Sequence, residues 1–187
     1  MWDMKVQFIK VGELKCNCYL VEKEQQYLLI DPGADYEKIL QFIQGKDIVA
    51  ILITHSHFDH VGCVEQLVQD FGYPVYQKDN LEEGHHQIGN FSFEVIYTFG
   101  HTMDCITYYF KEEQIMFTGD FLFSGTIGRC DLVGSDYQEM LKSIHKIKKY
   151  DDNILVYPGH GVETKLGREK KNNIYFKELE RMIQDES

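Results

Sequence analysis

The chain has 187 residues, of which 43% are hydrophobic and 26% charged, and its formal net charge at pH 7 is −11. This length is sufficient for one domain with a full core, and the composition is that of a folded globular protein. The acidic balance argues against general nucleic-acid binding, which depends on neutralising phosphates. No run approaches the roughly 18 apolar residues of a membrane helix, and the first residues lack the apolar stretch of a signal peptide. We therefore expect a cytoplasmic protein.

Short apolar runs and helical periodicities alternate along the chain. Strands are predicted at residues 5–12, 17–24, 26–33, 47–54, 73–77, 91–99, 105–112, 114–120 and 153–160. Helices are predicted at residues 35–45, 62–72, 136–150 and 167–184. There is no clear repeat or linker. This arrangement favours a mixed α/β architecture built in layers.

The five cysteines form an odd and scattered set, at positions 16, 18, 63, 105 and 130. Cys16 and Cys18 are too close in sequence for an unstrained disulfide, and their spacing differs from that of common zinc sites. We interpret all five as reduced structural thiols.

The stretch 51–62, ILITHSHFDHVG, places four ligand-type side chains at the end of an apolar strand. In an extended segment His55 and His57 would point the same way, whereas Asp59 and His60 fall where the chain turns into the next helix. Taken alone, the stretch is either a histidine-rich loop or half of a metal site. Four such side chains from six residues cannot all reach one tetrahedral ion, but they can serve two ions a few ångströms apart.

Three more apolar runs end in a glycine followed by a potential ligand. Ligands at the ends of rigid strands converge more accurately than ligands on free loops, and glycine allows the sharp turn. Seven ligands are too many for one zinc ion but suit two ions that share a carboxylate. The three pairs are Gly100-His101, Gly119-Asp120 and Gly159-His160.

Together, the segments HSHFDH, GHT, TGD and GHG resemble the metallo-β-lactamase superfamily. Within it, GDFLFSGTIGR and YPGHGVETKLG resemble the short hydroxyacylglutathione hydrolase (glyoxalase II-like) branch. This resemblance implies an α/β fold, a four-layer αββα sandwich of two mixed β-sheets flanked by helices. It also implies a single metallo-hydrolase domain over residues 1–187, without the C-terminal glutathione-binding helical domain of glyoxalase II.

The resemblance also implies a ligand set and a reaction. One ion would be held by His55, His57 and His101. The second would be held by Asp59, His60 and His160, with Asp120 bridging both. We expect two Zn²⁺, with Fe or Mn as alternatives at one or both sites. A metal-bound hydroxide would attack a thioester or ester carbonyl, with Asp59 and Asp120 as the catalytic carboxylates. True β-lactamases have cysteine or histidine at the bridging position, so Asp120 disfavours β-lactam hydrolysis.

The sequence departs from the family pattern around His101, where FGHTMDC stands in place of PGHTPG. Phe99, Met103, Asp104 and Cys105 should reshape the pocket wall, so the resemblance does not imply a glutathione thioester. A different thiol carrier, a small ester or a lactone stays open. A mononuclear-iron persulfide dioxygenase, using two histidines and an aspartate, is the second enzyme class. A metal-binding regulatory or scaffold protein is the non-enzymatic alternative. The expected partner is a small acyl thioester or ester, with no nucleic acid and no membrane; the oligomeric state is open.

The remaining candidates each carry two interpretations. Asp31 either supports a ligating histidine from behind or caps a turn before Pro32. Arg129 and Lys165 either bind a substrate carboxylate or are ordinary surface residues. We interpret His85 and His86 as part of a solvated loop, and His145 as a solvent-facing residue of a helix.

Overall fold

The computed structural model describes the backbone of residues 4–185 and the side chains of residues 4–179. The first sheet has the order β1-β2-β3-β4-β5. Its strands are β1 (Lys5–Val11), β2 (Cys16–Lys23), β3 (Gln26–Ile30), β4 (Asp47–Leu52) and β5 (Val75–Tyr76). It is mixed, because β1, β2 and β3 pair antiparallel whereas β3, β4 and β5 pair parallel.

The second sheet comes from the second half of the chain and has the order β13-β12-β9-β8-β7-β6. Its strands are β6 (Gly84–Ile88), β7 (Phe91–Tyr97), β8 (Ile106–Phe110), β9 (Ile115–Gly119), β12 (Leu155–Pro158) and β13 (Thr164–Lys165). A small hairpin pairs β10 (Leu122–Phe123) with β11 (Thr126–Ile127). This sheet is also mixed, since β9 and β12 run parallel and the other neighbours antiparallel.

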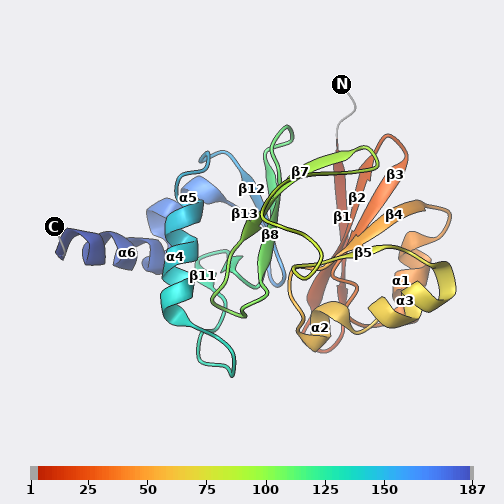
Figure 1. The fold of residues 1–187 in the computed structure, drawn as a ribbon, viewed down its shortest axis with the longest axis horizontal. Helices are drawn as coiled ribbons and strands as arrows, with labels where there is room; N and C mark the ends of the chain where they lie inside the picture. The colour runs from red at the N-terminus through yellow and green to blue at the C-terminus, as the bar shows by residue number, and fades with distance from the viewer. Residues whose placement is uncertain (1–3, 186–187) are drawn as a thin grey trace.

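Helices cover the outer face of each sheet, which gives the predicted αββα sandwich (Figure 1). The helices beside the first sheet are α1 (Tyr36–Ile43), α2 (Phe58–Val61) and α3 (Val64–Phe71). Those beside the second sheet are α4 (Tyr137–Ile147), α5 (Leu166–Asn172) and α6 (Ile174–Asp185). Ile39 of α1 and Leu67 of α3 are completely buried against the first sheet, and Ile144 of α4 is completely buried against the second.

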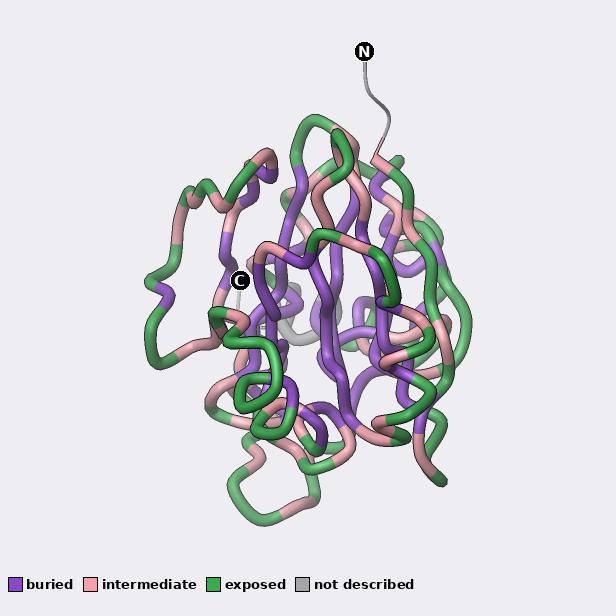
Figure 2. The backbone as a smooth tube through the Cα atoms, turned by 90° about the vertical axis from the view of Figure 1, so that its right-hand side faces the viewer, coloured by how far each residue is buried: buried purple, intermediate pink, exposed green. Residues whose placement is uncertain are grey.

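The alternation of side chains along each strand divides the core into three layers. In β3, Leu28 and Ile30 face the second sheet, whereas Leu29 faces the helices. In β8, Tyr108 faces the first sheet and Tyr109 faces α4 and its neighbours. Because both faces of these strands are covered, they consist of apolar runs without polar alternation. The central strands are buried along much of their length (Figure 2).

The predicted strands and helices are present, with ends displaced by a few residues, but two interpretations were wrong. The stretch with His85 and His86 is the edge strand β6, which pairs with β7 and is not a loop. The closing helix 167–184 is broken at Asn173, whose buried amide donates to the carbonyl of Thr126 and to Glu169 Oε2. His145 is exposed on α4, as expected.

The five cysteines are free, and four of them are buried. Over residues 4–185, no helix has both the length and the apolar composition that a membrane crossing requires.

Candidate metal centre

All seven side chains predicted as ligands meet between the two sheets. Four segments carry them, and each follows the end of a strand. These strands are β4, β7, β9 and β12. The first sheet contributes His55, His57, Asp59 and His60, and the second contributes His101, Asp120 and His160. Each half of the chain therefore supplies part of one cluster.

The first part of this cluster, here the three-histidine group, consists of His55, His57 and His101. His57 Nδ1 lies 3.1 Å from His55 Nε2 and 3.0 Å from His101 Nε2. All three ligand atoms lie within 4.8 Å of one another. A tetrahedral zinc ion with Zn–N bonds of 2.0–2.1 Å spaces its nitrogen ligands roughly 3.3 Å apart. The spacing of the group thus fits one divalent cation.

The electrostatic state of this group suits metal binding. Burial, together with the neighbouring histidines, holds the pKa of His55 well below its usual value. Burial and the neighbouring His101 also lower the pKa of His57. Both imidazoles are therefore neutral near pH 7, and a neutral imidazole is the form that coordinates a metal.

The second part, here the Asp59 group, consists of Asp59, His60 and His160. His160 Nε2 lies 3.1 Å from Asp59 Oδ2, and His60 Nε2 lies 3.6 Å from the same oxygen. Burial alone would lower the pKa of His60, but Asp31 and Asp120 outweigh it and raise that pKa well above its ordinary value. For His160 burial also lowers the pKa, but the hydrogen bond with Asp59 and the charge of Asp120 together outweigh burial and raise it.

Asp120 lies between the two groups. Its Oδ1 is 3.3 Å from His60 Nε2, and its Oδ2 is 3.6 Å from His101 Nε2 and 3.5 Å from His160 Nε2. Burial alone would raise the pKa of Asp120, but His60 outweighs it and lowers that pKa, so the carboxylate is ionised. One carboxylate thus reaches a histidine of each group.

Two buried atoms at the centre of the cluster fit a cation in particular. His60 Nε2 and Asp120 Oδ1 have no hydrogen-bond partner among the described residues. Buried polar atoms in folded proteins are nearly always satisfied. A nitrogen and a carboxylate oxygen that face each other in this way are the donor types that zinc, iron and manganese accept.

Four histidines are held from behind through Nδ1, which leaves Nε2 facing the cluster. The Nδ1 atoms of His101 and His160 donate to the backbone carbonyls of Arg129 and Leu14, at 2.8 and 3.1 Å. His55 Nδ1 lies 3.2 Å from Thr54 Oγ1. His60 Nδ1 lies 2.8 Å from Asp31 Oδ2. A carbonyl partner requires the proton on Nδ1, so Nε2 is the nitrogen of His101 and His160 that is left to coordinate a cation.

Asp31 does more than contact His60. Its carboxylate accepts hydrogen bonds from the backbone N and the hydroxyl of Thr54, at 2.8 and 2.7 Å. Asp31 thus joins the end of β3 to the segment that follows β4. Of its two interpretations, the geometry favours the partner of a histidine.

Sequence reasoning did not connect Cys16 to this cluster. Its Sγ lies 3.6 Å from His60 Nδ1, on the ring edge that also faces Asp31. Burial raises the pKa of Cys16 to about 11, so the group is a thiol at neutral pH. Cys16 and His60 are 44 positions apart in the sequence, which explains why no local pattern showed the contact.

Glycine is required where the chain passes closest to the cluster. A Cβ at Gly159 would lie 2.2 Å from Asp120 Oδ1 and 2.7 Å from His60 Cε1. Neither contact is sterically tolerable, so the glycine before His160 makes room for the aspartate between the groups.

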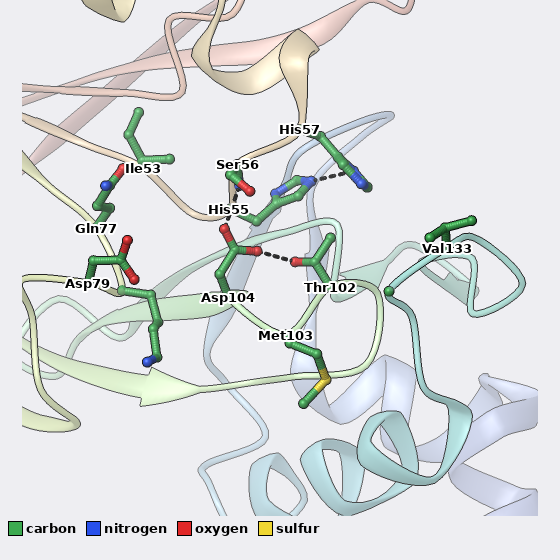
Figure 3. A pocket seen from close by; sticks show the side chains of 12 residues that line it. Ile53, His55, Ser56, His57, Gln77, Asp79, Thr102, Met103, Asp104 and Val133 are labelled. Carbon is green, nitrogen blue, oxygen red and sulfur yellow. Dashed lines mark hydrogen bonds between the residues drawn. The ribbon is translucent and has the colours of Figure 1, made fainter.

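A cavity of about 600 Å³ opens beside the three-histidine group, and its wall includes Ser56, Met103, Asp104 and Val133 (Figure 3). Two predicted substrate-binding residues are not part of this wall. The guanidinium of Arg129 pairs with Asp131 at 2.9 Å, and Lys165 is exposed on β13. Their proposed role stays a prediction.

The sandwich and the histidine–aspartate cluster define a class of metal-binding α/β proteins, and the comparison with known families identifies it. The model of the metallo-beta-lactamase superfamily matches residues 11–86 and 77–160. The chain belongs to this superfamily, whose members bind divalent metals and include metal-dependent hydrolases.

Two similar proteins show the range of relatives. The probable metallo-hydrolase YqgX of Bacillus subtilis is 32% identical, over 92% of this chain and 98% of the relative. The hydroxyacylglutathione hydrolase GloC of Haemophilus influenzae is 33% identical, over 92% of this chain and 98% of the relative.

Solved structures of similar proteins share this fold. The BLEG-1 B3 metallo-beta-lactamase superposes with a TM-score of 0.87 at 30% identity, over 92% of this chain and 99% of the other. TTHA1623, solved in a di-iron-bound form, superposes with a TM-score of 0.82 at 34% identity, over 89% and 98%.

Proposed function

We propose that this protein is a dinuclear metal-dependent hydrolase that cleaves a thioester or a related small acyl ester, acting in the cytoplasm as a single domain. The observation that carries the proposal is the position of Asp120. Its two oxygens face histidines of two separate groups, which is the arrangement needed for a carboxylate shared by two cations. One structural ion needs only about four ligands, so a protein that held one such ion would not need a second group of ligands beside the first.

The proposed ligands follow the two groups. His55, His57 and His101 would hold one cation, Asp59, His60 and His160 the other, and Asp120 both. Zn²⁺ is the proposed metal, with Fe or Mn as alternatives. When bound, the cations supply Lewis acidity, which lowers the pKa of a coordinated water and polarises an acyl carbonyl.

The protein's own residues would orient the reactants. Asp59 and Asp120 supply carboxylate oxygens that accept hydrogen bonds from the attacking water. Both are ionised, since nearby histidines outweigh burial and lower their pKa values. Because Asp31 and two backbone carbonyls fix the histidine rings from behind, little reorganisation accompanies the reaction.

Two features bear on the substrate. The similarity to GloC supports a thioester with a small hydroxyacyl group. Met103 and Asp104 stand in the cavity wall where the family pattern PGHTPG has proline and glycine. They make this wall bulkier and more acidic. We therefore keep the thiol carrier open, and a lactone or another ester is the alternative within the same reaction class.

The test is a hydrolysis screen of zinc-loaded and iron-loaded protein, using lactoylglutathione, other acyl thioesters, lactones, a β-lactam and a persulfide. The proposal expects about two metal ions per chain and turnover of a thioester or ester. His57→Ala and Asp120→Ala should each reduce that turnover by at least about 100-fold. One iron per chain with oxygen uptake on the persulfide would replace the proposal with a dioxygenase. Turnover of the β-lactam alone would also contradict it.

A further inference from the structure

Two ligand-carrying segments run side by side where the sheets meet beside the three-histidine group. The segment after β4 holds His55 and His57, and the segment after β7 holds His101. The backbone N of Ile106 donates to the carbonyl of Thr54 at 2.9 Å, which pairs the two segments at one point. Beyond that point, a side chain continues the connection.

That side chain is Asp104, and each of its oxygens serves a different segment. Oδ2 accepts a hydrogen bond from the backbone N of Ser56 at 3.0 Å. Oδ1 accepts one from the hydroxyl of Thr102 at 2.6 Å. Ser56 is the residue between His55 and His57, and Thr102 directly follows His101. Figure 3 shows the carboxylate of Asp104 between these two partners.

His57 depends on this connection more than the other histidines do. The rings of His55, His60, His101 and His160 are each held through Nδ1 by a further protein group. His57 instead turns its Nδ1 toward His55 and His101, and no hydrogen bond to its Nε2 is found within residues 4–179. The position of His57 is therefore set mainly by its backbone, and the bond from Asp104 to Ser56 N anchors that backbone.

We propose that Asp104 is a positioning residue that fixes the spacing of the three-histidine group and thereby sets the affinity and geometry of the cation held there. This inference rests on the proposed function, which places a cation at that group. The carboxylate stands where the pattern PGHTPG has glycine. Small displacements suffice for an effect, since a site works only within about 0.5 Å of its productive geometry.

Two variants separate the hydrogen bond of Asp104 from its charge. Asp104→Ala removes both. In Asp104→Asn, the amide oxygen can still accept from Ser56 N, while the amide nitrogen can donate to the Thr102 hydroxyl. If Asp104 acted only through its negative charge, for example by attracting a substrate, both variants would lose its effect equally.

The experiment titrates Co²⁺ into metal-free wild-type protein and its variants, and follows both binding constants and the visible absorption of bound cobalt. One equivalent is one bound Co²⁺ ion per chain, and the equivalent that is lost in His57→Ala belongs to the three-histidine group. For that equivalent, Asp104→Ala should weaken binding by about 10- to 100-fold and change the absorption spectrum, as removal of a supporting contact does in metal sites. The other equivalent should keep its affinity. Asp104→Asn should stay within a few-fold of wild type.

Two further variants guard the interpretation. Asp79→Ala removes another carboxylate from the same cavity wall and should leave both equivalents unchanged. Thr102→Ala removes only one of the two bonds and should weaken the same equivalent less than Asp104→Ala, which provides a test even if Asp104→Ala does not fold.

The inference is overturned if the foldable variants bind both equivalents with wild-type affinity and spectrum, or if Asp104→Asn is as weak as Asp104→Ala. Tight binding of two ions by wild type with no effect of Asp104 would overturn this inference alone. If no ion bound by the wild type is lost in His57→Ala, both this inference and the proposed function are wrong.

Discussion

Nδ1 of His60 lies 2.8 Å from Oδ2 of Asp31, and both side chains are almost completely buried. This contact turns the imidazole so that Nε2 faces Asp120. The same carboxylate accepts two hydrogen bonds from Thr54, the residue before His55. One buried aspartate therefore supports residues of both groups.

Replacing this aspartate should affect stability and metal binding together. In Asp31→Ala, three buried groups lose their acceptor, and each unsatisfied group costs about 1–3 kcal/mol. We expect the free energy of unfolding of the metal-free protein to fall by roughly 3 kcal/mol or more, and metal affinity at the Asp59 group to fall by about 10- to 100-fold. Denaturant titration and metal titration measure the two effects. Asp47→Ala, at an exposed position of β4, is the control and should change neither.

Gly159 offers a steric test of the cluster. In Gly159→Ala the new Cβ would meet Asp120 Oδ1 at 2.2 Å, so the aspartate or the His160 segment has to move. We expect at least one of two metal equivalents to be lost, along with most activity. Gly161→Ala is the matched control, because no atom lies within 4 Å of its Cβ although its φ is +84°. It should cost about 1 kcal/mol of stability and keep both metals. Two retained metals in Gly159→Ala would contradict the proposed position of Asp120.

The two groups should differ in how metal binding depends on pH. His60 and His160 have raised pKa values in the metal-free protein, so their ion pairs stabilise it at low pH, and this stabilisation is lost as pH rises through those raised values. Metal binding at the Asp59 group must release these protons, and its affinity should increase as pH rises from about 6 to 8. His55 and His57 have lowered pKa values and are already neutral, so the three-histidine group should change less.

Metal titrations at several pH values, with His57→Ala and His160→Ala used to assign the equivalents, measure this difference. Equal pH dependence of the two equivalents would show that the groups are not protonated differently.

Removal of the metals should lower thermal stability. A ligand that binds only the folded state at 100 times its dissociation constant contributes about 2.7 kcal/mol. For a chain of this size, that corresponds to a decrease of roughly 5–10 °C in the unfolding midpoint for each ion removed. Calorimetry before and after chelation, and again after Zn²⁺ is restored, measures the shift. In Asp120→Ala the shift should be much smaller, and an unchanged midpoint in wild type would argue against tight binding.

The cluster was predictable from sequence because its ligands stand at strand ends in a short, spaced pattern. The structure brings together all seven, and also Asp31, which the sequence left between two roles. Contacts between distant segments were not predictable. The Cys16–His60 contact spans 44 residues and the Ser56–Asp104 bond spans 48, and neither leaves a local periodicity.

The fold shows the same division between local and long-range effects. Buried strands were found from their apolar runs, whereas β6 was missed because an edge strand with the sequence GHHQI pairs through its backbone and needs no apolar pattern. The break in the closing helix was missed because Asn173 bonds to Thr126, 47 residues away.

The two sheets arise from two continuous stretches of chain, residues 5–76 and residues 84–165, with a single crossing between them. A cut within that crossing would leave His55, His57, Asp59 and His60 on one fragment, and His101, Asp120 and His160 on the other. Neither fragment would hold either group complete. Separately produced fragments should consequently reassemble as a heterodimer whose dissociation constant depends on free metal and which a chelator takes apart. In the intact chain, metals bound at the two groups would cross-link the two halves.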